Sequence, residues 1–256
     1  MAKHLVLSGV GTLCVWDDKP VTVHDLQTST FLNSRDCLGQ KLSSATLAGL
    51  RELNEFVKYE DRTVPIGGVD AEALAGAALV VVSSLGTELS TKISRLCESE
   101  DISFLAMDCF GFHGYAFLRP SAALAPATVS YHALAENWWK VGSSRADIFK
   151  YFQVAFAFHA REGRFPTIGS DDDVSRALAI CAEVTGCSDS PPVKAPDALR
   201  QFLHHSNGQL NAVSAMVGSV CGQECIKVLS LNGNVMDNCF LFDGSSIFGQ
   251  VVRLQV

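Results

Sequence analysis

The sequence lacks the features that mark several broad classes of protein. Its 256 residues include 20 basic and 27 acidic side chains, a net charge of −7, which argues against nucleic-acid binding as the main activity. No apolar run reaches the roughly 18 residues that a membrane-spanning helix needs. The N-terminal stretch "MAKHLVLSGVG" has neither the length nor the small-residue cleavage pattern of a secretory signal. We therefore expect neither a nucleic acid nor a membrane as a partner.

The nine cysteines include no C-x-x-C pair, so we expect no structural zinc site. Most of them lie in apolar segments, where cysteine behaves as a small buried hydrophobe, and this fits a reducing intracellular compartment. Cys221 and Cys225 stand at i and i+4 of a predicted helix, which favours two core thiols over two metal ligands. The adjacent His204 and His205 point in different directions on a helix, so we interpret them as a solvated helix end.

The first half of the chain alternates between strands and helices. This rhythm is typical of an α/β fold with a doubly wound, mostly parallel sheet. The run "AALVVVSS" is the clearest strand signal, because it is apolar on both faces. The predicted elements are a helix ending near residue 8, a buried strand at 11–18, a helix at 37–58, a strand at 77–84, an amphipathic helix at 87–100, a strand at 102–109 and an antiparallel return at 113–120.

After Pro120 the sequence becomes largely helical and then closes with strands. The predicted elements are an aromatic helical segment at 133–160, a helix at 171–186, a linker-like loop at 188–196, a short helix at 197–205, a long helix at 212–230 and a hairpin of 238–244 with 249–254. We expect one domain over residues 1–256. Its predicted parts are a Rossmann-like part at 1–119, a helical and loop insertion at 120–211 and the closing helix and hairpin at 212–256.

The stretch "MDCFGFHGYAF" (107–117) allows two readings. Asp108, Cys109 and His113 could form a catalytic trio, or the stretch could be a strand that reverses at Gly111 and Gly114. Catalytic cysteine and histidine residues usually come from distant segments, and this pair has no evident third group to orient it. We therefore favour the structural reading, in which the aromatic residues alternate and pack on both sides.

Two motifs carry a resemblance to a known family. The segments "ISFLAMDCFGFHGYAF" (102–117) and "NAVSAMVGSVCGQECIKVLSLNGNVMDNCFLFDG" (211–244) resemble ThiF/MoeB-type adenylating enzymes. More narrowly, they are similar to the smaller, noncatalytic subunits of SUMO-activating enzymes. The resemblance covers nearly the whole chain, although 120–147 and 187–208 match poorly. It implies the Rossmann-like, ThiF-type adenylating fold.

The resemblance also implies which parts an active adenylating relative needs. The glycine-rich nucleotide-binding turn would precede Met1 in this sequence. Asp17 falls where an acid would hold the ribose, although a solvated acid at a strand end explains it as well. In the basic segment "GQKLSSA" (39–45), Lys41 is present but Leu42 stands where the family has an arginine.

The acid that handles Mg²⁺ in active relatives is replaced here by Leu85. Asp70 and Asp108 lie too far along the chain to substitute for it. The resemblance therefore implies a chain with no catalytic, cofactor-binding or metal-binding residues and no cofactor of its own. Mg-ATP would be bound by a partner subunit.

The implied role is that of a noncatalytic subunit in a heterodimeric activating enzyme. The implied partners are a larger catalytic adenylating subunit and a ubiquitin-like modifier, SUMO in the first place. The implied location is the nucleus, with the cytoplasm as a second compartment. Two alternatives stay open. The chain could serve another ubiquitin-like modifier, or it could be a free-standing α/β enzyme that uses Asp108, Cys109 and His113.

A doubly wound sheet without its first, central strand would leave two inner strand edges unpaired, which is costly. We expect either that the protein begins upstream of Met1 or that the strand at 11–18 pairs directly with the strand at 77–84.

Overall fold

The computed structural model describes residues 1–29, 31–32, 34–62, 65–125, 129–142, 146–187, 191–231 and 234–256. The chain forms two compact units. The first comprises Met1–Ala75 with Gly218–Ile226, and the second comprises Gly76–Val217 with Lys227–Val256. A single long helix, α10 (Asn211–Ser230), therefore contributes residues to both units.

The first unit is built around two short parallel strands. β1 (Thr12–Val15) pairs with β2 (Lys58–Asp61), and the register runs from Thr12 opposite Lys58 to Val15 opposite Asp61. Leu13 and Val15 of β1 pack against a core formed by the buried residues Val6, Leu47 and Leu50. The helical elements of this unit are α1 (Ala2–Leu7), α2 (Val23–Thr28), η1 (Arg35–Cys37), α3 (Leu42–Arg51), η2 (Ile66–Gly68) and α4 (Ala71–Leu74).

The helix predicted over 37–58 is wrong in its extent. The α-helix in this range is α3, which occupies its central part. After α3 the chain turns and continues as strand β2. Asn54 stabilises the turn, because its side-chain amide donates to the Val6 carbonyl at 2.9 Å and its side-chain oxygen accepts the Phe56 N–H at 3.0 Å. Phe56, an apolar residue near the end of the predicted helix, is 90% exposed.

The strand predicted at 11–18 exists as β1, but it is not a buried strand, because Thr12 and Cys14 are exposed and Leu13 and Val15 are only partly buried. Among the described residues its partner is β2, so direct pairing with the strand at 77–84 is wrong. The preceding helix ends as predicted, since α1 stops at Leu7 and Gly9 has a φ of +74°.

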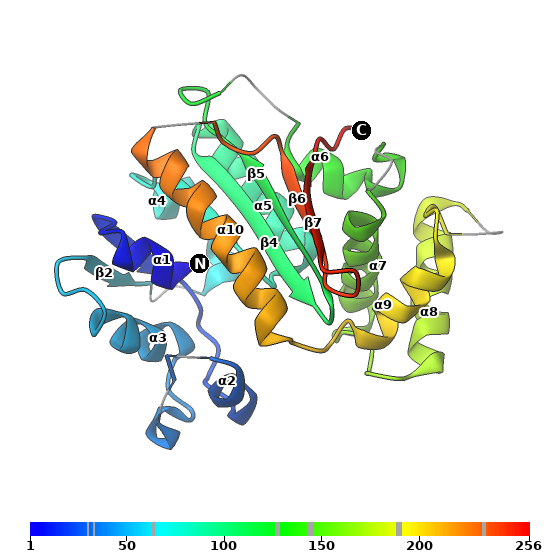
Figure 1. The fold of residues 1–256 in the computed structure, drawn as a ribbon, viewed down its shortest axis with the longest axis horizontal. Helices are drawn as coiled ribbons and strands as arrows, with labels where there is room; N and C mark the ends of the chain where they lie inside the picture. Colours follow the sequence, from blue (N-terminus) through cyan, green and yellow to red (C-terminus); the bar gives the residue numbers. More distant parts are fainter. Residues whose placement is uncertain are drawn as a thin grey trace. The chain divides into compact units, whose positions relative to one another are not determined.

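The second unit contains a five-stranded sheet in the order β3-β4-β5-β6-β7 (Figure 1). The α/β class is confirmed, with mixed sheets rather than a mostly parallel one. Only β3 and β4 run parallel in this sheet, and the other three pairs are antiparallel. Short turns, which permit only antiparallel pairing, join β4 to β5 and β6 to β7. The strands are β3 (Leu79–Val82), β4 (Ser103–Phe110), β5 (His113–Arg119), β6 (Cys239–Asp243) and β7 (Phe248–Val252).

The helices of the second unit follow the sequence prediction with one change. The aromatic segment at 133–160 is divided into two helices and a 3-10 turn, and residues 143–145 lie outside the described part. Residues 188–190 of the predicted linker also lie outside it. The elements are α5 (Gly86–Ser99), α6 (Tyr131–Glu136), η3 (Trp138–Lys140), α7 (Asp147–Glu162), α8 (Asp171–Thr185) and α9 (Pro196–His205).

Different helices cover the two faces of the five-stranded sheet. On one face, the Tyr115 ring of β5 lies edge-on to Phe149 and Phe152 of α7. On the other face, β5 approaches α10 so closely that a Cβ atom on Gly114 would lie 2.5 Å from the Val217 Cγ2 atom. Side chains alternate along a strand, so neighbouring residues of β4 face different helices.

By length and composition alone, α10 could span a membrane, and it is the one such helix among the described residues. Core helices of soluble proteins meet the same criterion, and α10 carries the fully buried residues Val217, Cys221 and Cys225. The criterion is therefore weak evidence for a membrane span.

Candidate functional site

Asp108 is the centre of a buried hydrogen-bond network. Its carboxylate accepts the backbone N–H of Ser84 at 2.5 Å and the hydroxyl of Tyr115 at 3.1 Å. The Tyr115 and Tyr131 hydroxyl oxygens lie 3.0 Å apart. Burial raises the pKa of Asp108 to about 7, against the opposite effect of the Ser84 and Tyr115 donors. The carboxyl group thus connects the end of β3, the middle of β4 and helix α6.

Cys109 does not share a site with Asp108. Asp108 lies opposite Tyr115 in the β4–β5 pairing, and Cys109 lies opposite Gly114, so the two side chains point to opposite faces of the sheet. Burial also raises the pKa of the Cys109 thiol to about 12, which disfavours the thiolate that a nucleophile requires. The trio proposed as an alternative is therefore not brought together.

His113 lies on the same face as Asp108 but has other neighbours. Its Nε2 atom is 3.6 Å from an Asp243 carboxylate oxygen, and its ring lies edge-on to Tyr151 and Phe202. Burial lowers the pKa of His113. The structural reading of residues 107–117 is confirmed for the strand reversal, since the three side chains serve three separate contacts. The expected packing of the aromatic residues on both sides is wrong. Phe110, Tyr115 and Phe117 all lie on the face covered by α6 and α7.

The reversal between β4 and β5 depends on glycine. Gly111 has a φ of +53°, and a Cβ atom there would lie 2.9 Å from the Cβ and carbonyl oxygen of His205. The Gly111 N–H donates to the Gly208 carbonyl at 2.8 Å, which fixes the turn against the chain after α9. The aromatic residues do not all pack in the core, however, because Phe112 in the turn is 45% exposed.

Lys41 and the residues after it form the second candidate region, in the first unit. The Lys41 ammonium lies 2.7 Å from the Asp61 carboxylate and also donates to the Arg62 carbonyl. The Ser43 and Ser44 hydroxyls, in the first turn of α3, donate to the same carboxylate. Burial alone would raise the pKa of Asp61, but the Lys41, Ser44 and Ser43 donors hold it at about 2.

Asp17 lies at the end of β1 and accepts the Lys19 N–H at 3.1 Å through its side chain. The sequence did not reveal Asp61, because it lies 20 residues from Lys41 and ends a strand too polar to be predicted. As the last residue of β2 it lies beside the end of β1, since parallel strands place their carboxyl ends together.

The family resemblance leads us to expect the Mg²⁺-handling acid of active relatives at the loop after β3. Leu85 occupies it, directly before α5, between Ser84 with a φ of +57° and Gly86 with a φ of +72°. Asp70 caps α4, where its side chain accepts the Ala73 N–H at 2.9 Å. These residues do not fit a Mg-ATP site, because the one retained cation is held by Asp61 and the loop side chain is apolar.

The cysteine and histidine pairs that we did not expect to bind a metal make other contacts. Cys221 and Cys225 are buried on α10, and burial raises the pKa of Cys225 to about 12. His204 lies 3.3 Å from Asp171, and His205 lies edge-on to Phe112. In the part of the chain that the structure describes, no cluster of three or more His, Cys, Asp or Glu side chains is arranged to hold a metal ion.

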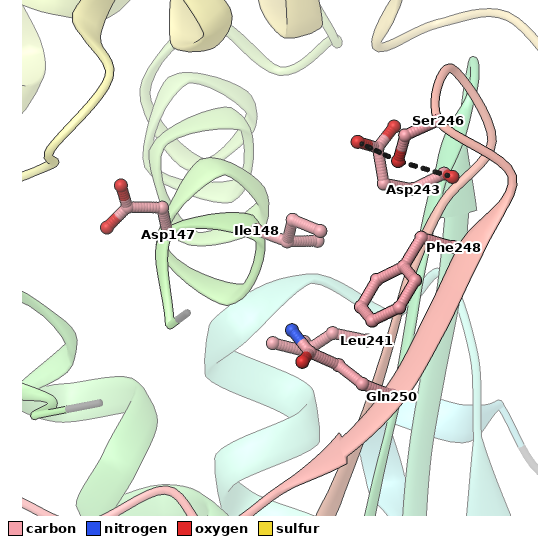
Figure 2. Close-up of a pocket in the computed structure, with 7 residues that line it drawn as sticks. All are labelled: Asp147, Ile148, Leu241, Asp243, Ser246, Phe248 and Gln250. Atoms are coloured by element: carbon pink, nitrogen blue, oxygen red, sulfur yellow. Dashed lines mark hydrogen bonds between the residues drawn. The ribbon is translucent and has the colours of Figure 1, made fainter. Parts of the chain in front are cut away.

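A pocket of about 350 Å³ lies in the second unit between the start of α7 and the β6–β7 hairpin (Figure 2). Ile148 faces Phe248 and Leu241 across it, and the Asp147 side chain points away (Figure 2). Asp243 at the rim accepts a hydrogen bond from Ser246 at 2.8 Å. The lining residues are Asp147, Ile148, Leu241, Asp243, Ser246, Phe248 and Gln250. This lining combines the apolar Ile148, Leu241 and Phe248 with a polar rim in which the Ser246 hydroxyl is bonded to Asp243.

Comparison with known proteins identifies the family. The ThiF family model matches residues 1–255. The chain belongs to the ThiF family. Two similar proteins are each called SUMO-activating enzyme subunit 1. The Dictyostelium discoideum protein is 24% identical over 94% of this chain and 79% of its own length. The Xenopus laevis protein is 28% identical over 98% of this chain and 84% of its own length.

A third relative, the DNA damage tolerance protein rad31 of Schizosaccharomyces pombe, is 26% identical over 99% of this chain and 85% of its own length. Among solved structures, E. coli MccB in a crystal structure with MccA-N7isoASN matches with a TM-score of 0.60 at 12% identity. The match covers 99% of this chain but only 59% of the MccB chain, and it supports the fold alone.

Proposed function

We propose that this ThiF-family chain is the noncatalytic subunit of a heterodimeric enzyme that activates a ubiquitin-like modifier, SUMO in the first place. The observation that carries the proposal is the extent of the similarity to SUMO-activating enzyme subunit 1. It spans 94% and 98% of this chain in the Dictyostelium discoideum and Xenopus laevis proteins. The whole described fold, rather than one motif, therefore supports it.

Three features of the site support a noncatalytic role. The Lys41 ammonium is engaged by Asp61 within the chain, so it is not available to neutralise a ligand phosphate. Leu85 offers no oxygen to Mg²⁺, which binds through oxygen ligands. Cys109 and Asp108 lie on opposite faces of the sheet, which opposes the alternative of a free-standing enzyme.

The partner in this proposal is a larger adenylating subunit with its own catalytic cysteine, which would bind Mg-ATP and form the adenylate and thioester. The chain carries no cofactor in this proposal. Its place of action would be the nucleus, where the complex is expected from the family, with the cytoplasm as a second compartment. A subunit for another ubiquitin-like modifier is the alternative, which the choice of modifier in the assay tests.

The test is a reconstitution with the full chain. Three samples are compared: the chain alone, the larger subunit alone and their mixture. Each receives ATP, and pyrophosphate exchange is measured. Each then receives SUMO or another ubiquitin-like modifier, and thioester formation is measured. We expect activity with SUMO only where the larger subunit is present, and a strong increase on adding this chain. Exchange by the chain alone, or a larger subunit that is fully active without it, would contradict the proposal.

A further inference from the structure

Four large apolar side chains are exposed at one end of the five-stranded sheet. They come from the β4–β5 turn, the segment before α8, the segment before α10 and the β6–β7 turn. Their exposed fractions are 45% for Phe112, 58% for Ile168, 39% for Leu210 and 84% for Ile247. We call these four residues the hairpin-tip patch. All of them belong to the second unit.

Backbone contacts hold these segments together. The Gly244 N–H donates to the Phe112 carbonyl at 2.6 Å, which joins the two hairpin turns that Figure 1 shows at the same end of the sheet. The Gly111 N–H donates to the Gly208 carbonyl at 2.8 Å. A Cβ atom on Gly208 would lie only 3.9 Å from the Ile168 Cδ1 atom. These contacts, made at three glycines, bring the segments that carry the patch next to one another.

The patch is separate from the core of its own sheet. Phe110, one step before the turn, is buried and packs on Phe152 with ring centroids 4.9 Å apart. Phe112 points outwards and contacts only the edge of the His205 ring among the described aromatic groups. Single exposed apolar residues are ordinary, but a connected group of them marks an interaction surface.

The fixed charges beside the patch are acidic, and each of the two acids has a histidine next to it, His204 at 3.3 Å from Asp171 and His113 at 3.6 Å from Asp243. Asp171 follows Ile168 closely in the chain, and Asp243 precedes the turn that carries Ile247. Burial would raise the pKa of Asp243, but the Ser245 and Ser246 donors hold it below its ordinary value, so the group stays ionised. The guanidinium group of Arg164, which lies nearby, forms a bidentate ion pair with Asp173 at 2.7 and 2.8 Å.

We propose that the hairpin-tip patch is a docking surface for the larger adenylating subunit, which would bring apolar side chains flanked by Lys or Arg. This inference rests on the proposed function. Charge complementarity selects this occupant over a second copy of the same chain, because a symmetric contact would place Asp171 and Asp243 against the same acids of the other copy.

The experiment measures binding of the full chain to the purified larger subunit by calorimetry. Phe112→Ser and Ile247→Ser, singly and combined, are the test variants, because both side chains are exposed and little of the fold depends on them. We expect the double variant to weaken binding at least about tenfold, as loss of a central apolar contact does. Phe56→Ser is the matched control, since Phe56 is 90% exposed in the other unit, and its affinity should be unchanged.

A charge variant tests the rim. Asp171→Lys should slow association several-fold at low salt, and the difference from the unmodified chain should shrink as salt is added. Circular dichroism of every variant checks that the fold is kept. Unchanged affinity in a folded double variant overturns the inference, as does a patch that instead mediates self-association or modifier binding. If the unmodified chain does not bind the larger subunit at all, the proposed function itself fails.

Discussion

The Asp108 carboxylate accepts the backbone N–H of Ser84 at 2.5 Å, so a buried residue of the inner strand β4 holds the loop that leads into α5. Ser84 has a φ of +57°, in the left-handed region that costs a residue other than glycine on the order of 1 kcal/mol. The hydrogen bond stabilises this backbone conformation. The loop and the carboxyl group should therefore respond together to protonation.

The first prediction concerns the pH dependence of stability. The pKa of Asp108 is about 7 in the folded chain, against about 3.9 when unfolded, so the folded state binds this proton more tightly. Its contribution to the free energy of unfolding is full below pH 4 and falls as the pH rises to 7, by on the order of a few kcal/mol. Urea unfolding of the unmodified chain and of Asp108→Asn from pH 4.5 to pH 8 measures it.

We expect the difference in unfolding free energy between the two proteins to change across this range in favour of Asp108→Asn at the higher pH. Two curves that stay parallel from pH 4.5 to pH 8 would show that Asp108 does not titrate there.

The second prediction concerns the first unit. Asp61→Asn removes the ion pair with Lys41 and the charge that Ser43 and Ser44 support, and should lower the free energy of unfolding at pH 7 by about 1–3 kcal/mol. Because the pKa of Asp61 is about 2, below the unfolded value, this contribution is present above pH 4 and is lost as the pH falls towards 2.

Glu60→Gln is the matched control for Asp61, because Glu60 lies on the same strand and its ion pair with Lys58 is exposed. It should leave the denaturation midpoint at pH 7 unchanged. An equal effect of the two substitutions would mean that the Asp61 contacts stabilise the fold no more than an exposed ion pair does.

The third prediction concerns thiol reactivity. Burial raises the pKa of Cys109 to about 12, whereas Cys14 and Cys187 are exposed. Brief treatment of the native chain with iodoacetamide at pH 7.5, followed by mass spectrometry, should modify Cys14 and Cys187 well before Cys109. Cys109→Ala should not reduce thioester formation by the complex. Rapid modification of Cys109 would reopen its reading as a nucleophile.

The fourth prediction concerns the contact between β5 and α10. Gly114→Ala would place a methyl group 2.5 Å from the Val217 Cγ2 atom and should destabilise the chain by about 1–3 kcal/mol. Val217→Ala in the same chain should recover part of this loss by removing the clashing methyl groups. Gly142→Ala, with nothing within 4 Å, should be nearly neutral in thermal unfolding. Equal melting temperatures for all these variants would contradict the packing.

The elements that the sequence predicted well have local signals. The helix over 171–186 is α8, which begins where Ser170 accepts the Asp173 N–H and ends at Gly186 with a φ of +70°. The β4–β5 and β6–β7 hairpins follow from apolar runs separated by glycine turns. In these places a few neighbouring residues determine the backbone, so no distant contact is needed to find them.

The failures depend on distant contacts. β2 reads "KYED", too polar to suggest a strand, and it forms only because β1 supplies a parallel partner. Leu53 and Phe56 continued the helical spacing of α3, but the Asn54 contact with Val6 ends the pattern. The Lys41–Asp61 ion pair was not predicted either, because Asp61 lies in this missed strand. For the 107–117 stretch, in contrast, the sequence already favoured a strand reversal over a catalytic trio, and the β4–β5 register then places Asp108 and Cys109 on opposite faces.

The three tryptophans are divided between the two compact units. Trp16 belongs to the first, and Trp138 and Trp139, with ring centroids 5.9 Å apart, belong to the second. Each unit thus contains its own fluorescent reporter. Substituting Trp16 by phenylalanine, or the other two together, would let unfolding of each unit be observed separately and would reveal whether the shared helix α10 makes them melt as one.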